Sequence, residues 1–349
     1  MLFRHIAPQL LFQFQHPSLS FIKGFKKPYT MAQKVFITGA TGFIGRVVTD
    51  LAVKEGYIVR GLSRREEGDV LLKSLGATPV RGTLTDTSLL TEESKNADIV
   101  LHLAFDHDFT SKSFQQLVDL DITAVTALAK GLEGSGKPLV VSHGTAAVQA
   151  DPNGEETDET APLAEHAFVV RVTAEKHALS FVDKGVRVIG IRLPQYVYGR
   201  GNSTGWAAIL IKFALQAGEA GYVGDGEYCF SDVYVDDAAH LYLLAAKNGK
   251  AGDIFNATGH TTTTYKALAD AISKLVRVPT KSITAEECAE LWGPFASTFV
   301  SLRNRASNRK AVDQLGWKPV GPDLLSEVHS GSYGAVAEKF REEIATKAK

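Results

Sequence analysis

The glycine-rich segment TGATGFIG, at residues 38–45, constrains the fold more than any other part of the sequence. It follows a short apolar run and opens a stretch with helical character. In such a segment the first glycine permits a tight turn, the second lets the backbone approach a pyrophosphate, and the third lets the helix pack closely on the strand. Backbone amides at the helix start then point at the phosphates. Because a second strand follows about twenty residues later, the pattern predicts a dinucleotide-binding turn rather than a purely structural one.

Short β-branched runs alternate with helical stretches from residue 34 onward, and each run is apolar on both faces. This pattern is typical of a parallel sheet with helices on both sides. We therefore predict an α/β fold, a Rossmann-type doubly wound parallel sheet with a small carboxy-terminal substrate-binding lobe. The expected strands cover residues 34–38, 57–62, 79–81, 99–103, 139–142 and 188–193, and the expected helices include 46–54, 114–132 and 174–182.

The rhythm changes after Leu193, and the chain becomes glycine-rich at 199–205. We expect helices at 206–217, at 266–276 and again after Pro322, with an irregular loop at 222–234 that leads into a short strand. The predicted domains are a leader at 1–30, a nucleotide-binding domain at 31–195 with a return segment near 228–256, and a mainly substrate-binding lobe at 196–349. Ligands of such folds bind beyond the carboxyl ends of the strands, so the lobe is expected to close over the substrate there.

Charge and cysteine content narrow the range of partners. The chain has 38 Lys and Arg against 39 Asp and Glu, a balance that gives no electrostatic reason to expect nucleic acid or an anionic membrane. No apolar run approaches the roughly 20 residues of a membrane-spanning helix, which predicts a soluble protein that binds a small-molecule substrate. The two cysteines, Cys229 and Cys288, lack disulfide or metal-ligand spacing and are expected to be buried apolar residues. A homodimer is left open.

The amino-terminal segment at 1–30 has its own composition. No acidic residue occurs before Asp50, and the basic residues of the segment are Arg4, Lys23, Lys26 and Lys27. This composition is typical of an organelle transit peptide. The alternative is that translation begins at Met31, directly before the first strand, and that the leader is an upstream extension. The expected location is the cytoplasm, or the mitochondrion if the leader is a transit peptide.

The end of the second predicted strand selects the cofactor. An acidic side chain there would bind the ribose 2′-hydroxyl and repel a 2′-phosphate. The sequence reads GLSRREE, so Ser63 and Arg64 stand at this point, and an arginine fork matches a phosphate. We therefore expect NADP, with NAD as the second choice. The alternative is that Arg64 and Arg65 only solvate the helix entrance and pair with Glu66 and Glu67.

Further motifs extend from Lys34 to about Pro319. They are TGATGFIG, RGTLTD at 81–86, HLA at 102–104, SHGTAAV at 142–148, RLPQYVYG at 192–199, GDGE at 224–227, VYVDDAA at 233–239 and LGWKP at 315–319. In this order and spacing they resemble the extended short-chain dehydrogenase/reductase family, which includes NAD-dependent epimerases and dehydratases. The resemblance implies a cofactor site formed by Gly39, Thr41, Gly42, Phe43, Ile44, Gly45, Ser63, Arg64, Thr83, Leu84, Leu103, Ala104, Phe105, Ser142, Arg171 and Pro194. It also implies that Leu84 lies near the adenine and that the Pro194 backbone faces the nicotinamide, while Thr83 replaces the family's usual aspartate.

The chain departs from the family at the Tyr-x-x-x-Lys pair that carries out the proton chemistry. The Ala174-Glu175 pair resembles that of the family, and counting back from it puts Ala167 at the tyrosine position and Arg171 at the lysine position. An arginine can hydrogen-bond the nicotinamide ribose and stabilise an oxyanion, but it stays protonated and cannot relay protons. The resemblance places Thr145 at the Ser or Thr position that polarises the substrate carbonyl.

His166 and Tyr198 are candidates for the missing acid, and both are expected near the pocket mouth. The alternatives are an exposed loop histidine for His166 and packing of the Tyr-Gly turn for Tyr198. Asp106, His107 and Asp108 follow the fourth strand and are open to three interpretations, which are a metal site, a substrate contact and a solvated loop. Adjacent residues of one loop rarely converge on a metal, so no metal is expected.

Three functions remain open from the sequence. The first is an NADP-dependent oxidoreductase that transfers hydride to or from a small carbonyl, enone or alcohol substrate, with Thr145, Arg171 and Tyr198 as catalytic candidates. The second is a non-catalytic NADP-binding sensor or scaffold, since a fold alone does not imply catalysis. The third is a sugar-nucleotide epimerase or dehydratase, which the missing tyrosine disfavours. Cofactor turnover with a panel of carbonyl compounds separates the first function from the second.

Overall fold

The computed structural model describes residues 32–108, 111–164 and 170–347. The predictions for the leader, for Met31, and for His166 and Ala167 lie outside the described residues. Across those three ranges, none of the helices has both the length and the apolar character that crossing a membrane requires.

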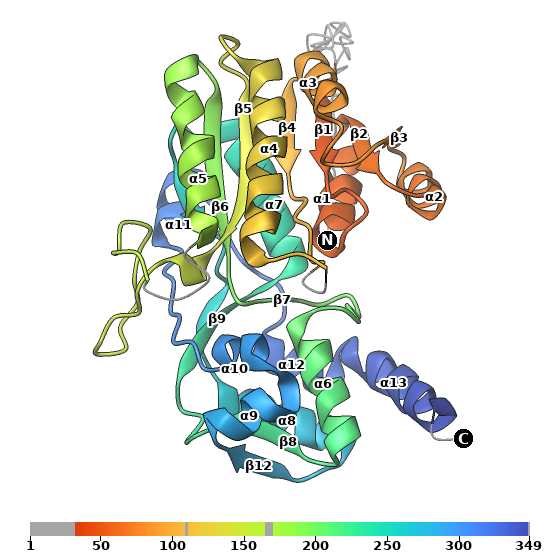
Figure 1. The fold of residues 1–349 in the computed structure, drawn as a ribbon, viewed down its shortest axis with the longest axis vertical. Helices are drawn as coiled ribbons and strands as arrows, with labels where there is room; N and C mark the ends of the chain where they lie inside the picture. The colour runs from red at the N-terminus through yellow and green to blue at the C-terminus, as the bar shows by residue number, and fades with distance from the viewer. Residues whose placement is uncertain (1–31, 109–110, 165–169, 348–349) are drawn as a thin grey trace, which may run out of the picture. The chain divides into compact units, whose positions relative to one another are not determined.

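A parallel sheet of seven strands organises the chain (Figure 1). The strands lie in the order β10-β6-β5-β4-β1-β2-β3, and every neighbouring pair is parallel. The winding reverses between β1 and β4, which is the point where ligands bind in such sheets. The bounds of the strands are β1 (Lys34–Thr38), β2 (Ile58–Ser63), β3 (Thr78–Arg81), β4 (Ile99–His102), β5 (Pro138–Gly144), β6 (Arg187–Leu193) and β10 (Ile254–Asn256).

Helices cover both faces of this sheet, because successive residues of each strand point to opposite sides. In β1, Val35 and Ile37 belong to one buried cluster, whereas Phe36 belongs to another. The predicted doubly wound α/β fold is therefore confirmed, and Figure 1 shows α4 and α5 side by side on one face. The cluster of Val35 contains residues of α1 (Phe43–Lys54), α2 (Glu66–Ser74), α7 (Val235–Asn248) and α11 (Arg309–Leu315), and that of Phe36 contains residues of α3 (Thr87–Asn96), α4 (Phe114–Leu132) and α5 (Arg171–Leu179).

A second core is built from elements after Leu193. Its helices, together with the two-stranded sheet of β8 and β12, are called the lobe. Besides the seven-stranded sheet, the described residues form a three-stranded sheet in the order β11-β9-β7 and a pair of strands, β12 and β8. The helices are α6 (Trp206–Ala217), α8 (Tyr265–Val276), α9 (Ala285–Trp292), α10 (Pro294–Phe299), α12 (Leu324–Ser330) and α13 (Tyr333–Lys347), and the strands are β7 (Tyr196–Tyr198), β8 (Ala220–Val223), β9 (Cys229–Tyr234), β11 (His260–Thr264) and β12 (Thr280–Ile283).

The prediction of an irregular loop at 222–234 is wrong for much of its length. β8 pairs with β12, and β9 pairs with β7 and β11, all of them from distant parts of the sequence. The turn between β8 and β9 contains Gly224 and Gly226 at φ values of 64° and 69°. The expectation that both cysteines are buried holds for Cys288 but not for Cys229, which lies in β9 and is partly exposed.

Two of the sequence motifs have a structural role. Trp317 of LGWKP is buried, and its indole nitrogen donates to the carbonyl oxygen of Asp237 in VYVDDAA at 2.9 Å. The Asp237 carboxylate accepts hydrogen bonds from the backbone nitrogens of Val320 and Gly321 at 3.1 and 2.8 Å. These contacts anchor the segment that precedes α12 onto α7.

Candidate active site

The glycine turn after β1 has the geometry that its sequence predicts. Gly39 has a φ of 72°, and a Cβ atom there would lie 2.7 Å from the backbone nitrogen of Ala104. A Cβ atom at Gly45 would overlap the carbonyl oxygen of Gly39. The helix α1 begins at Phe43, and no described side chain caps its amino end at Gly42. The first amides of α1 are therefore left for a ligand, and the turn fits a pyrophosphate.

The end of β2 carries an exposed cation. Ser63 is buried, and its hydroxyl donates to the carbonyl oxygen of Arg65 at 2.9 Å, whereas Arg64 is exposed. The ion pairs of the described residues do not include one from Arg64 or Arg65 to Glu66 or Glu67. The guanidinium of Arg64 is therefore not neutralised by these neighbouring glutamates in the described residues, and the choice between NADP and NAD stays a prediction.

The strand β3 leads into further residues of the predicted cofactor set. The backbone nitrogen of Thr83 donates to the carboxylate of Asp86 at 2.7 Å, and Leu84 packs against the cluster that covers one sheet face. Thr41 of the glycine turn lies close to α2, because a Cβ atom at Gly68 would be 3.0 Å from the Thr41 methyl group. The turn, the end of β2 and the start of α2 therefore converge.

The remaining predicted cofactor residues lie at the same edge of the sheet. Phe43 and Ile44 pack on the core at the start of α1. Leu103, Ala104 and Phe105 follow β4. Ser142 lies near the end of β5, and Pro194 follows β6. This edge is formed by the carboxyl ends of the strands, where ligands bind in such folds. Direct contacts of these residues with a cofactor stay a prediction.

A cavity of about 490 Å³ opens at this edge. Its wall combines the loop after β4, the end of β5 and the start of α5 with residues of α6 and α10 in the lobe. The ring of Trp206 stacks on that of Phe299, with 4.2 Å between the ring centroids and 14° between the planes. The lobe thus covers the strand ends where the sequence predicts the substrate. The aromatic lining residues are Phe105, Phe114, Trp206, Phe295 and Phe299.

Arg171, the first residue of α5, brings a positive charge to the cavity wall. Its guanidinium carbon lies 4.0 Å from the centroid of the Phe105 ring, and its Nη2 donates to the carbonyl oxygen of Ser142 at 3.2 Å. Its Nε is buried and has no hydrogen-bond partner among the described residues. Burial lowers the pKa of Arg171, yet an arginine stays protonated in proteins. The cavity wall therefore contains a restrained cation with one unused donor.

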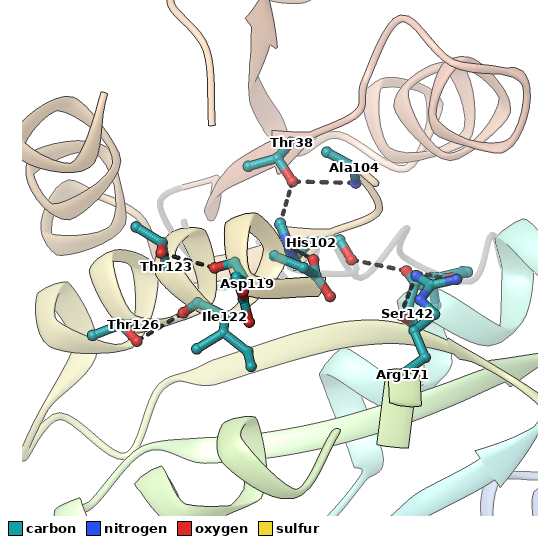
Figure 2. A network of polar contacts seen from close by, with 11 residues as sticks. Thr38, His102, Ala104, Asp119, Ile122, Thr123, Thr126, Ser142 and Arg171 are labelled. Atoms are coloured by element: carbon teal, nitrogen blue, oxygen red, sulfur yellow. Dashed lines mark hydrogen bonds and ion pairs between the residues drawn. The ribbon is translucent and has the colours of Figure 1, made fainter. Parts of the chain in front are cut away.

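Figure 2 shows polar contacts that lead from the glycine turn towards Arg171. The Oγ1 atom of Thr38 lies 2.6 Å from Nδ1 of His102 and accepts a hydrogen bond from the backbone nitrogen of Ala104 at 3.4 Å. The Nε2 atom of His102 lies 2.9 Å from the carboxylate of Asp121. Burial alone would raise the pKa of Asp121, but the hydrogen bond with His102 and the positive charge of Arg171 lower it. The glycine turn is therefore tied to β4 and α4 through buried polar groups.

The same contacts continue through β5 (Figure 2). The hydroxyl of Ser142 donates to the carbonyl oxygen of His102 at 2.8 Å and accepts a hydrogen bond from the hydroxyl of Tyr242 at 2.7 Å. The carbonyl oxygen of Ser142 accepts the bond from Arg171. Sequence reasoning missed this network, because Tyr242 and Ser142 are 100 residues apart along the chain.

Thr145 and Tyr198, which are predicted to be catalytic, both have hydroxyl groups bonded to the protein outside the cavity. Thr145 is fully buried and its hydroxyl donates to Oδ1 of Asn304 at 2.6 Å, while the Asn304 amide donates back to the Thr145 carbonyl oxygen at 3.2 Å. Tyr198 is also fully buried, its hydroxyl donates to the carbonyl oxygen of Pro322 at 2.7 Å, and burial raises its pKa. Neither is among the described residues that line the cavity. The expected place of Tyr198 at the pocket mouth is thus corrected, and packing of the Tyr-Gly turn accounts for this residue.

The loop after β4 holds the Asp106, His107 and Asp108 cluster. The ammonium of Lys112 lies 2.8 Å from the carboxylate of Asp106 and 3.7 Å from that of Asp108. His107 lines the cavity, and its ring contacts that of Phe105 edge-on at 5.3 Å between centroids. In the part of the chain that the structure describes, no group of three or more His, Cys, Asp and Glu residues forms a candidate metal site. Phe105 and His107 lie in the cavity wall, where a substrate would reach them, and a substrate contact stays a prediction.

His143 is a cavity residue to which the sequence analysis assigns no role. It lines the cavity at the end of β5 and is 3% exposed. The signal that could have found it is a histidine at the carboxyl end of a strand whose earlier residues are apolar, in the motif SHGTAAV.

The fold and this site define a Rossmann-type protein built to bind a nucleotide and a small molecule together. Residues 35–258 match the NAD dependent epimerase/dehydratase family. An uncharacterized protein of Saccharomyces cerevisiae is 34% identical over 299 residues, which are 85% of this chain and 98% of that protein. The chain belongs to the NAD dependent epimerase/dehydratase family.

Other similar proteins indicate the range of this family. A decarboxylating sterol-4-alpha-carboxylate 3-dehydrogenase of Dictyostelium discoideum is 28% identical over 246 residues, which are 67% of this chain and 74% of that protein. The crystal structure of a UDP-glucose 4-epimerase of Thermotoga maritima has a TM-score of 0.68 and 22% identity, covers 89% of this chain and 99% of its own, and shows the shared fold. The chain is accordingly an NAD(P)-dependent enzyme of the oxidoreductase type.

Proposed function

We propose that this enzyme is an NADP-dependent oxidoreductase of an atypical extended short-chain dehydrogenase/reductase branch. It transfers hydride to or from a small carbonyl, enone or alcohol substrate in the cavity. The observation that carries the proposal is the position of Arg171, a restrained cation in the wall of a mainly apolar cavity beside the predicted cofactor edge. Such a cation stabilises the substrate oxygen most strongly when negative charge develops on that oxygen during the reaction.

The preference for NADP is supported by the end of β2. Arg64 is exposed, and the nearby carboxylate of Asp69 in α2 is already paired with Arg81. A guanidinium in this position can bind the 2′-phosphate through two parallel hydrogen bonds, which a ribose hydroxyl cannot reproduce. NAD would lack this interaction and is expected to bind more weakly.

Arg171 is suited to an electrostatic role. The bound cofactor would supply or accept the hydride, while the substrate oxygen exchanges its proton with solvent. Phe105 and the Ser142 carbonyl already hold the guanidinium, so it needs little reorganisation when charge develops. A guanidinium donor that does not bond to Ser142 can bind the substrate oxygen or the nicotinamide ribose. Because an arginine keeps its proton, Arg171 acts as a positioned charge and not as the acid.

A direct role for Thr145 in polarising the substrate is less well supported. Its hydroxyl would have to leave Asn304, to which it donates at 2.6 Å. The hydroxyl of Ser231 also donates to the carbonyl oxygen of Asn304, at 2.9 Å. We therefore assign Thr145 to a contact that holds the end of β5 against the segment around Asn304.

The test is a cofactor-turnover assay with the full chain. NADPH is offered with aromatic and aliphatic aldehydes, ketones and enones, and NADP⁺ with the matching alcohols. We expect oxidation of NADPH by at least one apolar carbonyl or enone, with the reduced product identified by mass spectrometry. Tight NADPH binding without turnover of any compound would contradict the proposal and support a sensor. Turnover of a sugar nucleotide alone would support the epimerase alternative.

A further inference from the structure

His143 is a buried polar side chain whose hydrogen-bonding capacity is unused. It follows Ser142 in β5 and is 3% exposed. Both ring nitrogens are buried and have no hydrogen-bond partner among the described residues. Buried polar groups are almost always paired, because an unpaired group loses its hydrogen bonds to water without replacement. Two unpaired ring nitrogens at a ligand-binding edge therefore point to a ligand as the partner.

The cavity lies beside this residue, and a ligand there pairs with a ring nitrogen once the ring turns towards it, since both nitrogens are covered in the ligand-free arrangement. His143 lines it together with Gly144 and Arg171, whereas Thr145 is bonded to Asn304. The Nε atom of Arg171 is likewise buried without a partner in the described part of the chain. This wall therefore holds two side chains with unused polar atoms, and one of them carries no fixed charge.

We infer that His143 hydrogen-bonds the oxygen atom of the substrate, and that the substrate is a flat, mainly apolar carbonyl compound or the corresponding alcohol. The inference rests on the proposed function, since it concerns the same cavity. Trp206 and Phe299 stack at 4.2 Å, and the ring of Phe295 lies 6.1 Å from that of Trp206 with 20° between the planes. Flat rings pack well against such a surface. The substrate oxygen is then the group that needs a polar partner, and His143 supplies it.

The surroundings of His143 keep its ring neutral. The charged groups that face it are Arg171 and Glu175 of α5, Asp121 of α4 and Arg192 of β6. Burial is the largest effect and lowers the pKa of His143 to about 4, with the two arginines adding to it and the two carboxylates opposing it. Glu175 is engaged by the Arg192 guanidinium at 2.9 and 2.7 Å.

A neutral imidazole suits both directions of the proposed reaction. It has one donor nitrogen and one acceptor nitrogen, and the two tautomers exchange these roles. With the proton on the nitrogen that faces the substrate, His143 donates to a carbonyl oxygen. In the other tautomer the same nitrogen accepts a hydrogen bond from the hydroxyl of an alcohol.

The experiment compares two probes of the same shape on the full chain loaded with NADP⁺. Acetonaphthone carries a carbonyl oxygen, and isopropenylnaphthalene has a methylene group in its place. The oxidised cofactor cannot reduce the ketone, so the assay reports binding alone. Quenching of Trp206 fluorescence is the signal, and the Trp206→Phe variant gives the background from the other tryptophans.

We expect the wild-type chain to bind acetonaphthone about 10-fold more tightly than isopropenylnaphthalene, the scale of one hydrogen bond to an otherwise unpaired group. His143→Leu should remove this preference, and His143→Gln, which keeps a donor, should retain part of it. His329→Leu replaces an exposed histidine of α12 and should leave the preference unchanged. Equal binding of both probes by the wild-type chain would overturn the inference, even if a variant fails to fold. A preference for acetonaphthone that persists in His143→Leu would also overturn the inference.

Turnover measured in parallel distinguishes this inference from the proposed function. Oxygen-dependent binding through His143 without NADPH oxidation by any carbonyl compound would support the inference and contradict hydride transfer. NADPH oxidation with unchanged kcat and KM in His143→Leu would support hydride transfer and overturn the inference.

Discussion

The guanidinium carbon of Arg171 lies 4.0 Å from the centroid of the Phe105 ring, which joins the start of α5 to the loop after β4. A cation over an aromatic face is attracted by the ring, with about 0.5 to 2 kcal/mol depending on burial. The Ser142 carbonyl accepts a hydrogen bond from the same guanidinium. Arg171 is therefore held in place before any ligand binds, which is the condition for a preorganised charge.

Replacing Arg171 should slow the reaction in proportion to the charge and geometry that are lost. Arg171→Ala is expected to lower kcat/KM for carbonyl reduction by about 100-fold, because one stabilising donor of a developing oxyanion is removed. Arg171→Lys keeps the charge but not the planar fork, so a smaller loss is expected. Steady-state NADPH oxidation measures both.

A matched control exists for the arginine–aromatic contact. Arg303 lies over the ring of Tyr228 at 3.7 Å, and neither residue lines the cavity in the described structure. Arg303→Ala should leave kcat/KM unchanged. An equal loss in Arg303→Ala and Arg171→Ala would show that the effect does not come from the charge in the cavity.

Gly39 and Gly134 have nearly the same φ, 72° and 71°, but different surroundings. A Cβ atom at Gly39 would lie 2.7 Å from the nitrogen of Ala104, whereas at Gly134 it would meet no described atom within 4 Å. Gly134→Ala should cost only the left-handed strain of about 1 to 2 kcal/mol and leave cofactor binding unchanged. Gly39→Ala should cost more and weaken NADP(H) binding by about 10-fold or more, because the turn must open. Chemical unfolding and NADPH titration measure these effects, and equal results for the two variants would contradict the close approach at Gly39.

Arg64 should contribute to the binding of one cofactor and not the other. Arg64→Ala is expected to weaken NADP(H) binding by about 1.5 to 3 kcal/mol, the scale of a charge-assisted hydrogen bond, and to leave NAD(H) binding nearly unchanged. Titrations with both reduced cofactors, followed by fluorescence, provide the measurement. NAD(H) serves as the internal control, and equal losses for the two cofactors would rule out the assignment of Arg64 to the 2′-phosphate.

His143 should make the stability of the chain depend on pH. Its pKa in the folded chain is about 4, below the 6.5 of an unperturbed histidine, so between these values the unfolded chain binds more protons at this residue. Stability therefore rises with pH across this interval. The contribution is complete above about pH 6.5, is lost as the pH falls towards about 4, and amounts to roughly 3 kcal/mol.

Urea unfolding between about pH 7 and pH 4 measures this contribution as the difference between the wild-type chain and His143→Gln. The variant should lose less stability than the wild type as the pH falls. Parallel pH profiles of the two proteins would show that His143 is not held neutral in the folded chain.

The seven-stranded sheet could be predicted from the sequence, because the residue patterns that define its strands are local. Strands buried on both faces read as continuous apolar runs, and the turn at Gly39 needs a residue that tolerates positive φ, so both leave a signature in a short window. The small strands did not, because β8 and β9 are stabilised by partners from distant segments. A strand of this kind is defined by its partner more than by its own residues.

The candidate site was open to prediction to a smaller extent. The family resemblance correctly predicted that Arg171 lies at the cavity. Its position follows from a count of residues back from Ala174 and Glu175 in the same helix. The hydroxyls of Thr145 and Tyr198 bond to groups 159 and 124 residues away, and no local pattern indicates such partners. The sequence places His143 beside Thr145 at the end of the fifth strand but indicates no role for it, because the absence of a partner for its ring can be recognised only when its surroundings are known.

Direct hydride transfer is the central claim, and isotope transfer tests it. The full chain is incubated with acetonaphthone and NADPH that carries deuterium at both positions of the nicotinamide C4. The account predicts that deuterium appears on the carbinol carbon of the alcohol, with one label for each NADPH consumed. The contradicting result is tight binding of both NADPH and the ketone with no reduction and no label in the ketone or in any other carbonyl compound or enone tested. That result would identify a cofactor-binding sensor instead.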